Sequence, residues 1–229
     1  SNHLIECIYF NEEDYLFIGS DQGLEIYKYF KDEKIISKVQ DVSNLSNSAI
    51  VDFIKINDSQ HLLVSRDGKF FKLDFADGLY SIHQISVKNI PEDIVVKELF
   101  YNNKTLYVSK LYSGLLSISL LESPRVVKNY NFKSGLNTNA VNTSFIDREG
   151  VLWVGTYGGG LASKANNYFS FYFRDKFEPK EYTFFAVNDD YIFTSIEASI
   201  YKYRKHDFAL LKTFDSKHSL PNNKIVSFL

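Results

Sequence analysis

The chain has 229 residues, 45% of them hydrophobic and 24% charged, so it can bury a substantial core and has the composition of an ordinary globular protein. A formal net charge of −2 without a long basic run argues against nucleic acid as a partner of this segment. The apolar runs fall far short of the roughly 18 residues of a membrane span, and the single cysteine, Cys7, excludes an intramolecular disulfide.

Units of similar layout follow one another along the chain. We place five repeats at about 3–42, 43–87, 88–132, 133–173 and 174–215, and the start of a sixth at 216–229. The first repeat illustrates the layout, with apolar runs that predict strands near 4–10, 15–20, 24–29 and 35–40. Polar turn residues separate these runs.

Two independent markers set the period of the repeat. A small hydroxyl residue closes the second strand of each unit, at Ser20, Ser65, Ser109, Thr156 and Ser195, with separations of 45, 44, 47 and 39 residues. An apolar residue precedes the first strand by five positions, at Leu45, Ile90, Leu136, Phe177 and Leu220, with separations of 45, 46, 41 and 43 residues. Two markers that keep one period indicate a repeat architecture.

A repeat of this length with about four short strands is typical of one blade of a β-propeller. Leucine-rich repeats are shorter, and helical repeats need a 3.6-residue apolar period that is absent here. The sequence therefore predicts an all-β fold, a β-propeller fragment of about five four-stranded antiparallel blades plus the first strand of a sixth.

The fourth repeat is the most complete and reads GLNTNAVNTSFIDREGVLWVGTYGGGL over residues 135–161. It predicts a strand at 141–146, a tight turn at 147–150, a strand at 151–156, a glycine turn at 157–160 and a third strand from Leu161. Trp153 lies in the middle of an apolar strand, so we expect it in the core between blades.

This stretch resembles the two-component regulator propeller repeat, with its Asn-rich start, Asp-Arg-Glu-Gly turn, Leu-Trp-Val-Gly-Thr strand and glycine turn. The resemblance implies a periplasmic sensor region of a hybrid two-component regulator, as found in Bacteroides-like bacteria, many of which respond to glycans. It also implies a membrane-anchored parent protein that carries the histidine kinase and the DNA-binding output, neither of which is present in this segment.

One face of the propeller is expected to bind the ligand. In a four-stranded blade, the loops between the second and third strands and the links between blades emerge on the same side. The residues we expect to contact an oligosaccharide are Asp21, Arg66, Tyr112, Tyr157 and Glu197. The links add Asn47, Asn137, Asn139, Asn222 and Asn223. Aromatic faces and amides suit sugars, although Asn and Asp are also frequent in turns for conformational reasons.

Catalytic, metal and cofactor sites are not expected. The five histidines, His3, His61, His83, His206 and His218, fall at unrelated positions of the repeat, without metal-ligand spacing. The turn at 147–150 lacks the calcium-loop pattern, and the glycines at 155–160 lack the dinucleotide-binding spacing. Three function classes stay open: a ligand sensor, a protein-interaction scaffold, and a propeller hydrolase or lyase.

The two ends of the sequence suggest a piece of a longer chain. The sequence contains no methionine, Ser1 and Asn2 resemble the remnant of a cleaved tag, and the strand expected at 225–229 is the last stretch. A propeller cut after five blades exposes an apolar face at each end. We therefore expect a strained five-bladed ring or, in preference, association with a second copy.

Overall fold

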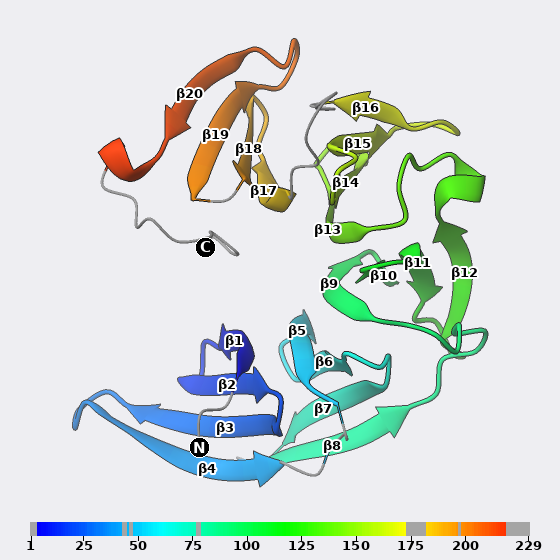
Figure 1. Cartoon of the computed structure of the whole chain (residues 1–229). Helices are drawn as coiled ribbons and strands as arrows, with labels where there is room; N and C mark the ends of the chain where they lie inside the picture. The colour runs from blue at the N-terminus through cyan, green and yellow to red at the C-terminus, as the bar shows by residue number, and fades with distance from the viewer. Residues whose placement is uncertain are drawn as a thin grey trace.

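The computed structural model describes residues 4–42, 45, 48–76, 79–172, 182–196 and 198–218. These residues form five four-stranded antiparallel sheets arranged as the blades of a β-propeller (Figure 1). Within each blade the strands pair in chain order, without crossovers. The expected all-β propeller of five four-stranded blades is therefore confirmed. Within this described part, no helix is long and apolar enough to cross a membrane.

The strands of the blades are short and similar in length. Blades one and two contain β1 (Ile5–Phe10), β2 (Tyr15–Ser20), β3 (Gly23–Phe30), β4 (Ile35–Val42), β5 (Ile50–Asn57), β6 (Gln60–Ser65), β7 (Phe70–Ala76) and β8 (Leu79–Ile85). Blades three and four contain β9 (Val96–Asn102), β10 (Thr105–Lys110), β11 (Gly114–Ser119), β12 (Arg125–Tyr130), β13 (Val141–Ile146), β14 (Leu152–Thr156), β15 (Leu161–Lys164) and β16 (Ser170–Tyr172). Blade five contains β17 (Tyr182–Val187), β18 (Tyr191–Ile196), β19 (Ser199–Arg204) and β20 (Leu210–Phe214). Two 3-10 turns, η1 (Phe132–Ser134) and η2 (Ser216–His218), lie outside the sheets.

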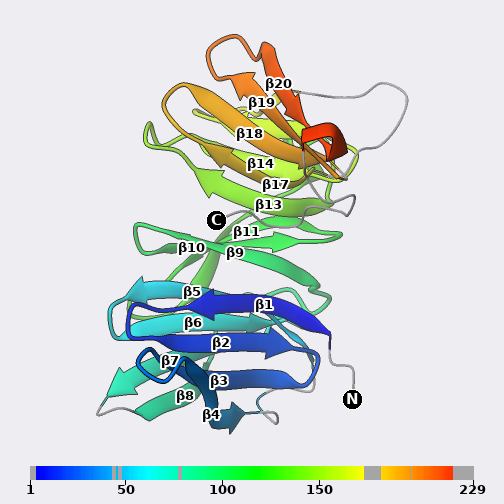
Figure 2. The same ribbon diagram turned by 90° about the vertical axis from the view of Figure 1, so that its left-hand side faces the viewer.

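The blades are arranged as an open arc. The first strand of each blade is innermost, and these strands contact one another in the order β1, β5, β9, β13 and β17 (Figure 1). In the described residues, the sheet of blade one does not pack face to face with that of blade five, and Figure 2 looks into this opening, with β1 below and β17 above. The described part is thus not a closed five-bladed ring.

The core consists of four apolar clusters, one at each junction between neighbouring blades. Phe17 and Leu63 belong to the cluster between blades one and two, and Val64 and Leu106 to that between blades two and three. Leu115 and Val154 belong to the next cluster, and the last one unites Trp153 of blade four with Ile192 and Tyr203 of blade five. Both faces of the inner blades are covered, which explains why their strands are apolar runs rather than alternating sequences.

The second strands end close to the expected hydroxyl residues, with two corrections. β2, β6 and β14 end at Ser20, Ser65 and Thr156 as predicted, but β10 continues to Lys110 and β18 to Ile196. Both strands are longer because their backbone pairing continues by one residue. Lys110 pairs with Val96 and Gly114, and Ile196 pairs with Tyr182 and Ser199. The hydroxyl marker was therefore one residue too early in blades three and five.

The marker before the first strand is an apolar anchor. Leu136 is buried, with 1% of its surface exposed, in the cluster between blades three and four. Leu45 and Ile90 pack against the clusters of the two preceding junctions. Phe177 and Leu220, and the strand expected at 225–229, lie outside the described residues.

Candidate ligand face

We call the end of the blades that carries the loops between second and third strands the 2–3 face; its loops lie at 21–22, 66–69, 111–113 and 157–160. One backbone hydrogen bond recurs there. The residue after the second strand donates its N–H to the residue before the first strand, from Asp21 to Leu4, Arg66 to Ala49, Leu111 to Val95 and Tyr157 to Ala140, over 2.8–3.1 Å. These loops therefore start at equivalent places around the arc.

The small hydroxyl at the end of the second strand closes the loop that follows. The Thr156 Oγ1 donates to the Gly160 carbonyl at 2.7 Å, and the Ser20 hydroxyl donates to the Gly23 carbonyl at 3.4 Å. Lys110 replaces the hydroxyl in blade three. It is fully buried, its Nζ donates to the Asn129 Oδ1 at 3.3 Å, and burial lowers its pKa to about 8.

Asp21 and Arg66 lie at the 2–3 face of blades one and two. The Asp21 carboxylate accepts the Leu4 N–H at 3.3 Å, so it holds the start of the chain against its own loop. The Arg66 guanidinium forms an ion pair with Glu6 at the start of β1. This pair joins the two blades, and 44% of the Arg66 side chain is still exposed.

A hollow of about 270 Å³ lies beside Arg66, where blades one, two and three meet. Its lining residues are Glu6, Val51, Arg66, Val95, Val96, Lys97 and Leu111. Lys97 is exposed at the rim, and the described residues offer it no ion-pair partner. The hollow thus combines an apolar wall with two cations and one carboxylate.

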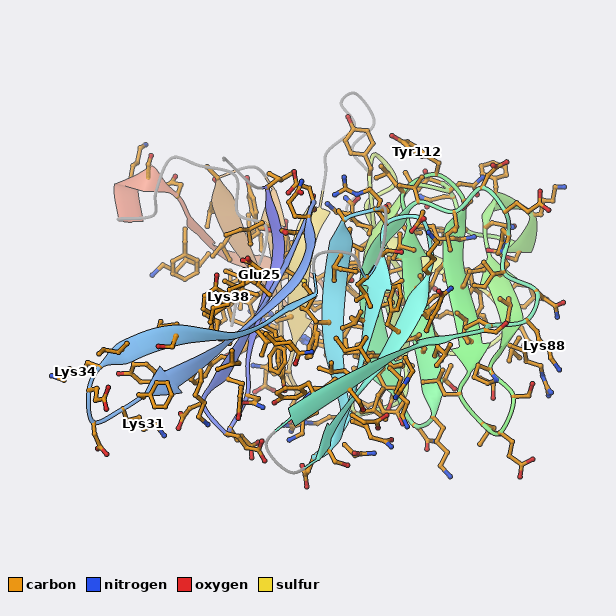
Figure 3. All side chains as sticks on the ribbon, turned by 90° about the horizontal axis from the view of Figure 1, so that it is seen from below. Glu25, Lys31, Lys34, Lys38, Lys88 and Tyr112 are labelled. Carbon is orange, nitrogen blue, oxygen red and sulfur yellow. The ribbon has the colours of Figure 1, made fainter. Side chains whose placement is uncertain are left out.

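Tyr112 and Tyr157 lie on blades three and four and are exposed over 71% and 49% of their surface. Figure 3 shows Tyr112 at the end of the blades, beyond the strands. The four described residues thus lie on the loops of four successive blades, one on each. Glu197, Asn47, Asn222 and Asn223 lie outside the described residues.

Acidic side chains that sequence reasoning missed lie between the inner strands. β1, β5, β9 and β13 each contain a β-bulge near their start. In the first three of these strands, the side chain of the residue after the bulge reaches the next blade. Asp52 accepts the Leu99 N–H at 2.6 Å, and Glu98 accepts the Ser144 N–H at 3.1 Å. At the equivalent place Cys7 directs its thiol to the Ile50 carbonyl, 3.9 Å away.

Burial dominates the titration of these groups. It raises the pKa of Asp52 to about 6, and that of Glu98 to about 8 with a contribution from the Asp52 charge. Burial likewise raises the pKa of the Cys7 thiol to about 12, which disfavours the thiolate form. The two acids could not be recognised from the repeat pattern, because the equivalent position is Cys7 in blade one and Thr143 in blade four.

The opposite end of blade four shows what the Asp-Arg-Glu-Gly turn does. The Asp147 carboxylate accepts the Trp153 Nε1–H at 2.8 Å and the Val151 N–H at 2.9 Å, and it pairs with Lys205 of blade five at 3.3 Å. Burial alone would raise the pKa of Asp147, but these partners lower it. Trp153 has only 4% of its surface exposed, so its predicted position between blades is confirmed.

His61 is the one titratable side chain in the described residues whose ring nitrogens are both buried without a hydrogen-bond partner. Its ring lies 5.1 Å from that of Phe53 and 5.5 Å from that of Tyr9, in the junction between blades one and two. Burial lowers its pKa to about 4, so the imidazole is neutral at physiological pH. In the described residues, no three His, Cys, Asp or Glu side chains gather as metal ligands.

Comparison with known families matches residues 135–158 to the two component regulator propeller. The resemblance seen in the fourth repeat is thus confirmed over those residues. A search of curated proteins finds no match.

Solved structures similar to this chain include extracellular domains from B. thetaiotaomicron. That of a putative one component system superposes with a TM-score of 0.71 at 16% identity, over 93% of this chain and 28% of the other. That of a putative hybrid two component system superposes with a TM-score of 0.58 at 18% identity, over 99% of this chain and 36% of the other. The chain thus spans about a third or less of these domains.

A third similar structure is that of YCF48 bound to a D1 peptide. It has a TM-score of 0.70 at 9% identity and covers 97% of this chain and 70% of the other. At these identities the likeness shows the propeller fold.

Proposed function

We propose that this chain is part of the periplasmic, ligand-sensing input region of a hybrid two-component regulator, and that its 2–3 face binds an oligosaccharide. The observation that carries the proposal is the match of residues 135–158 to the two component regulator propeller. The similar extracellular domains of B. thetaiotaomicron systems support it. The kinase and the DNA-binding output belong to the membrane-anchored parent protein.

The 2–3 face suits binding better than catalysis. Asp52 and Glu98 are partly buried carboxyl groups of the inner strands, and each already accepts a backbone N–H from the neighbouring blade. A hydrolase or lyase needs acids that are directed at the substrate. The exposed aromatic, amide and Arg66 side chains are recognition groups instead.

Isothermal titration calorimetry of the protein with a panel of oligosaccharides tests the proposal. We expect one oligosaccharide series to bind, with Arg66→Ala weakening the binding and Arg148→Ala, an exposed arginine of the opposite face, leaving it unchanged. Chromatography of the same mixtures should show no cleavage. Failure of every oligosaccharide to bind at millimolar concentration would contradict the proposal.

The second candidate is a protein-interaction scaffold, which the similarity to a propeller bound to a peptide favours. In that case the same face would bind a polypeptide. Peptide arrays probed with the protein distinguish the two, because a sensor of oligosaccharides gives no sequence-dependent peptide signal.

A further inference from the structure

The geometry points to a stacking platform for the pyranose rings of an uncharged oligosaccharide, formed by Tyr112, Phe132 and Tyr157 at the junction of blades three and four. We call these three residues the aromatic platform. The inference rests on the proposed function, since it names the subsite and the sugar chemistry within it. Phe132 was not among the residues expected from the sequence.

Three separate loops converge on two adjacent residues, Asn139 and Ala140. The Asn139 carbonyl accepts the Gly114 N–H at 2.7 Å, which fixes the loop that carries Tyr112. The Asn139 Oδ1 accepts the Phe132 N–H at 2.8 Å, and the Ala140 carbonyl accepts the Tyr157 N–H at 2.9 Å. The three loop segments that carry the aromatic residues are therefore each hydrogen-bonded to one dipeptide.

The three rings are free to meet a ligand. They are exposed over 71%, 68% and 49% of their surface in the order Tyr112, Phe132 and Tyr157. None of them belongs to the four core clusters of the described residues. Exposed large rings gathered on one face offer apolar area that a flat partner can cover.

Glycines let the supporting loops pack closely against the neighbouring backbone. Gly114 has a φ of +92°, and a Cβ there would lie 2.0 Å from the Tyr130 carbonyl oxygen. A Cβ at Gly159 would lie 2.6 Å from Thr138 Cγ2, and the Asn137 Nδ2 donates to the Gly159 carbonyl at 2.7 Å. Hydrogen bonds of Gly114, Tyr157 and Gly159 tie both loops to the 137–140 segment, and such pre-formed contacts lower the entropy lost on binding.

The charge of the surrounding segments indicates the class of ligand. Segments 111–114, 131–140 and 157–160 contain no Asp or Glu, and Lys133 is their one charged residue. A cationic ligand therefore has no counter-charge here. A pyranose with equatorial hydroxyls presents an apolar C–H face to an aromatic ring, and the exposed Asn139 in the same segment, whose Oδ1 accepts the Phe132 N–H, has an amide nitrogen that can donate to a sugar hydroxyl.

Calorimetry with unbranched neutral probes, namely cellohexaose, maltohexaose, xylohexaose and mannohexaose, tests the platform. For the probe that binds best, Tyr112→Ala, Phe132→Ala and Tyr157→Ala should each raise the Kd about tenfold, which corresponds to about 1.4 kcal/mol. Tyr112→Phe and Tyr157→Phe should keep the wild-type Kd, because stacking needs the ring and not the hydroxyl.

Tyr168→Ala is the matched control. Tyr168 is 85% exposed, lies between β15 and β16, and so belongs to the opposite end of blade four. Its loss should leave the Kd unchanged. If a probe binds and the three platform variants keep its Kd while Arg66→Ala weakens it, the platform is wrong and the proposed function stands. If none of the neutral probes binds but acidic oligosaccharides do, the platform is again wrong; if no saccharide binds at all, both fail.

Discussion

Blade four and blade one each have an apolar side that faces away from the core cluster shared with blade three and blade two, respectively. The side of blade four is covered by blade five, whereas that of blade one, its open side, is exposed among the described residues. At the junction, Trp153 packs against Ile192 and Tyr203 and is 4% exposed. On blade one, Cys7 and Tyr9 face blade two, so the alternation of β1 turns Ile8 and Phe10 to the other side, where they are 62% and 53% exposed. Composition alone does not distinguish the two sides, because coverage depends on a neighbouring blade.

The largest change in the free energy of unfolding is expected when the buried Trp153 is removed. Trp153→Ala should lower the free energy of unfolding by about 3–5 kcal/mol, since it removes a large side chain from a packed junction and leaves Asp147 without its indole donor. Urea denaturation followed by circular dichroism measures it. Tyr168→Ala, an exposed aromatic on the same blade, is the control, and equal unfolding midpoints for the two variants would show that Trp153 is not a core residue.

The second largest change in the free energy of unfolding is expected for His61, which lies in the junction of blades one and two. His61→Leu should raise the free energy of unfolding by about 1–3 kcal/mol, because both ring nitrogens of His61 are buried without partners among apolar rings. The gain should grow as the pH falls from 6.5 towards 4. In that range the unfolded imidazole binds a proton, whereas the folded one, with a pKa of about 4, does not.

Denaturation at several pH values separates this account from a general effect of removing histidines. His83 is exposed on β8, so His83→Leu should leave both the stability and its pH dependence close to those of the wild type. A His61→Leu variant that is less stable than the wild type at pH 5 would contradict the prediction.

The sequence was most informative where a position recurs in every blade. The apolar anchor before the first strand and the mid-strand Trp153 could be assigned because burial between blades demands the same chemistry each time. The second strand of blade three was expected to end at Ser109, with Lys110 in the loop of the ligand face, whereas Lys110 is the buried last residue of β10 and takes the place of the hydroxyl. The Glu6–Arg66 ion pair was not predictable, because it joins two blades and only the curvature of the arc brings these side chains together.

The sequence predicted which end of the blades carries the candidate site, but not which side chains lie close together there. Topology places Asp21, Arg66, Tyr112 and Tyr157 on the loops of one end, and the structure has them there. Phe132 belongs to a link between blades, where an aromatic residue can be either buried or exposed. The position of Phe132 depends on the Asn139 side chain, whose Oδ1 accepts the Phe132 N–H.

A pH-dependent effect concerns Glu98, one of the acids between the inner strands. Because the folded pKa of Glu98 is raised to about 8, the folded state holds a proton that the unfolded state releases above its ordinary pKa of 4.5. The contribution of Glu98 to stability should therefore fall as the pH rises from 5 to 8, by at most about 1.4 kcal/mol per pH unit. Glu98→Gln should flatten this decline and Glu92→Gln, an exposed carboxylate, should not. A difference in unfolding free energy between the wild type and Glu98→Gln that stays constant from pH 5 to 8 would contradict the assignment.

The smallest effect on folding is expected on the open side of blade one, where the consequence is association instead. Ile8→Ser combined with Phe10→Ser should change the free energy of unfolding by no more than about 1 kcal/mol, because both side chains are already exposed.

We expect a second copy to cover this apolar side of blade one. Ile36, at 55% exposure, and the Glu25–Lys38 ion pair, whose residues Figure 3 labels, flank it. Light scattering at micromolar concentration should show the wild type as a dimer or larger and the double variant as a monomer. Val127→Ser, which removes an apolar side chain that is 62% exposed on β12, should leave the association intact. A wild type that is a clean monomer and binds no hydrophobic dye would show that the open side remains solvated.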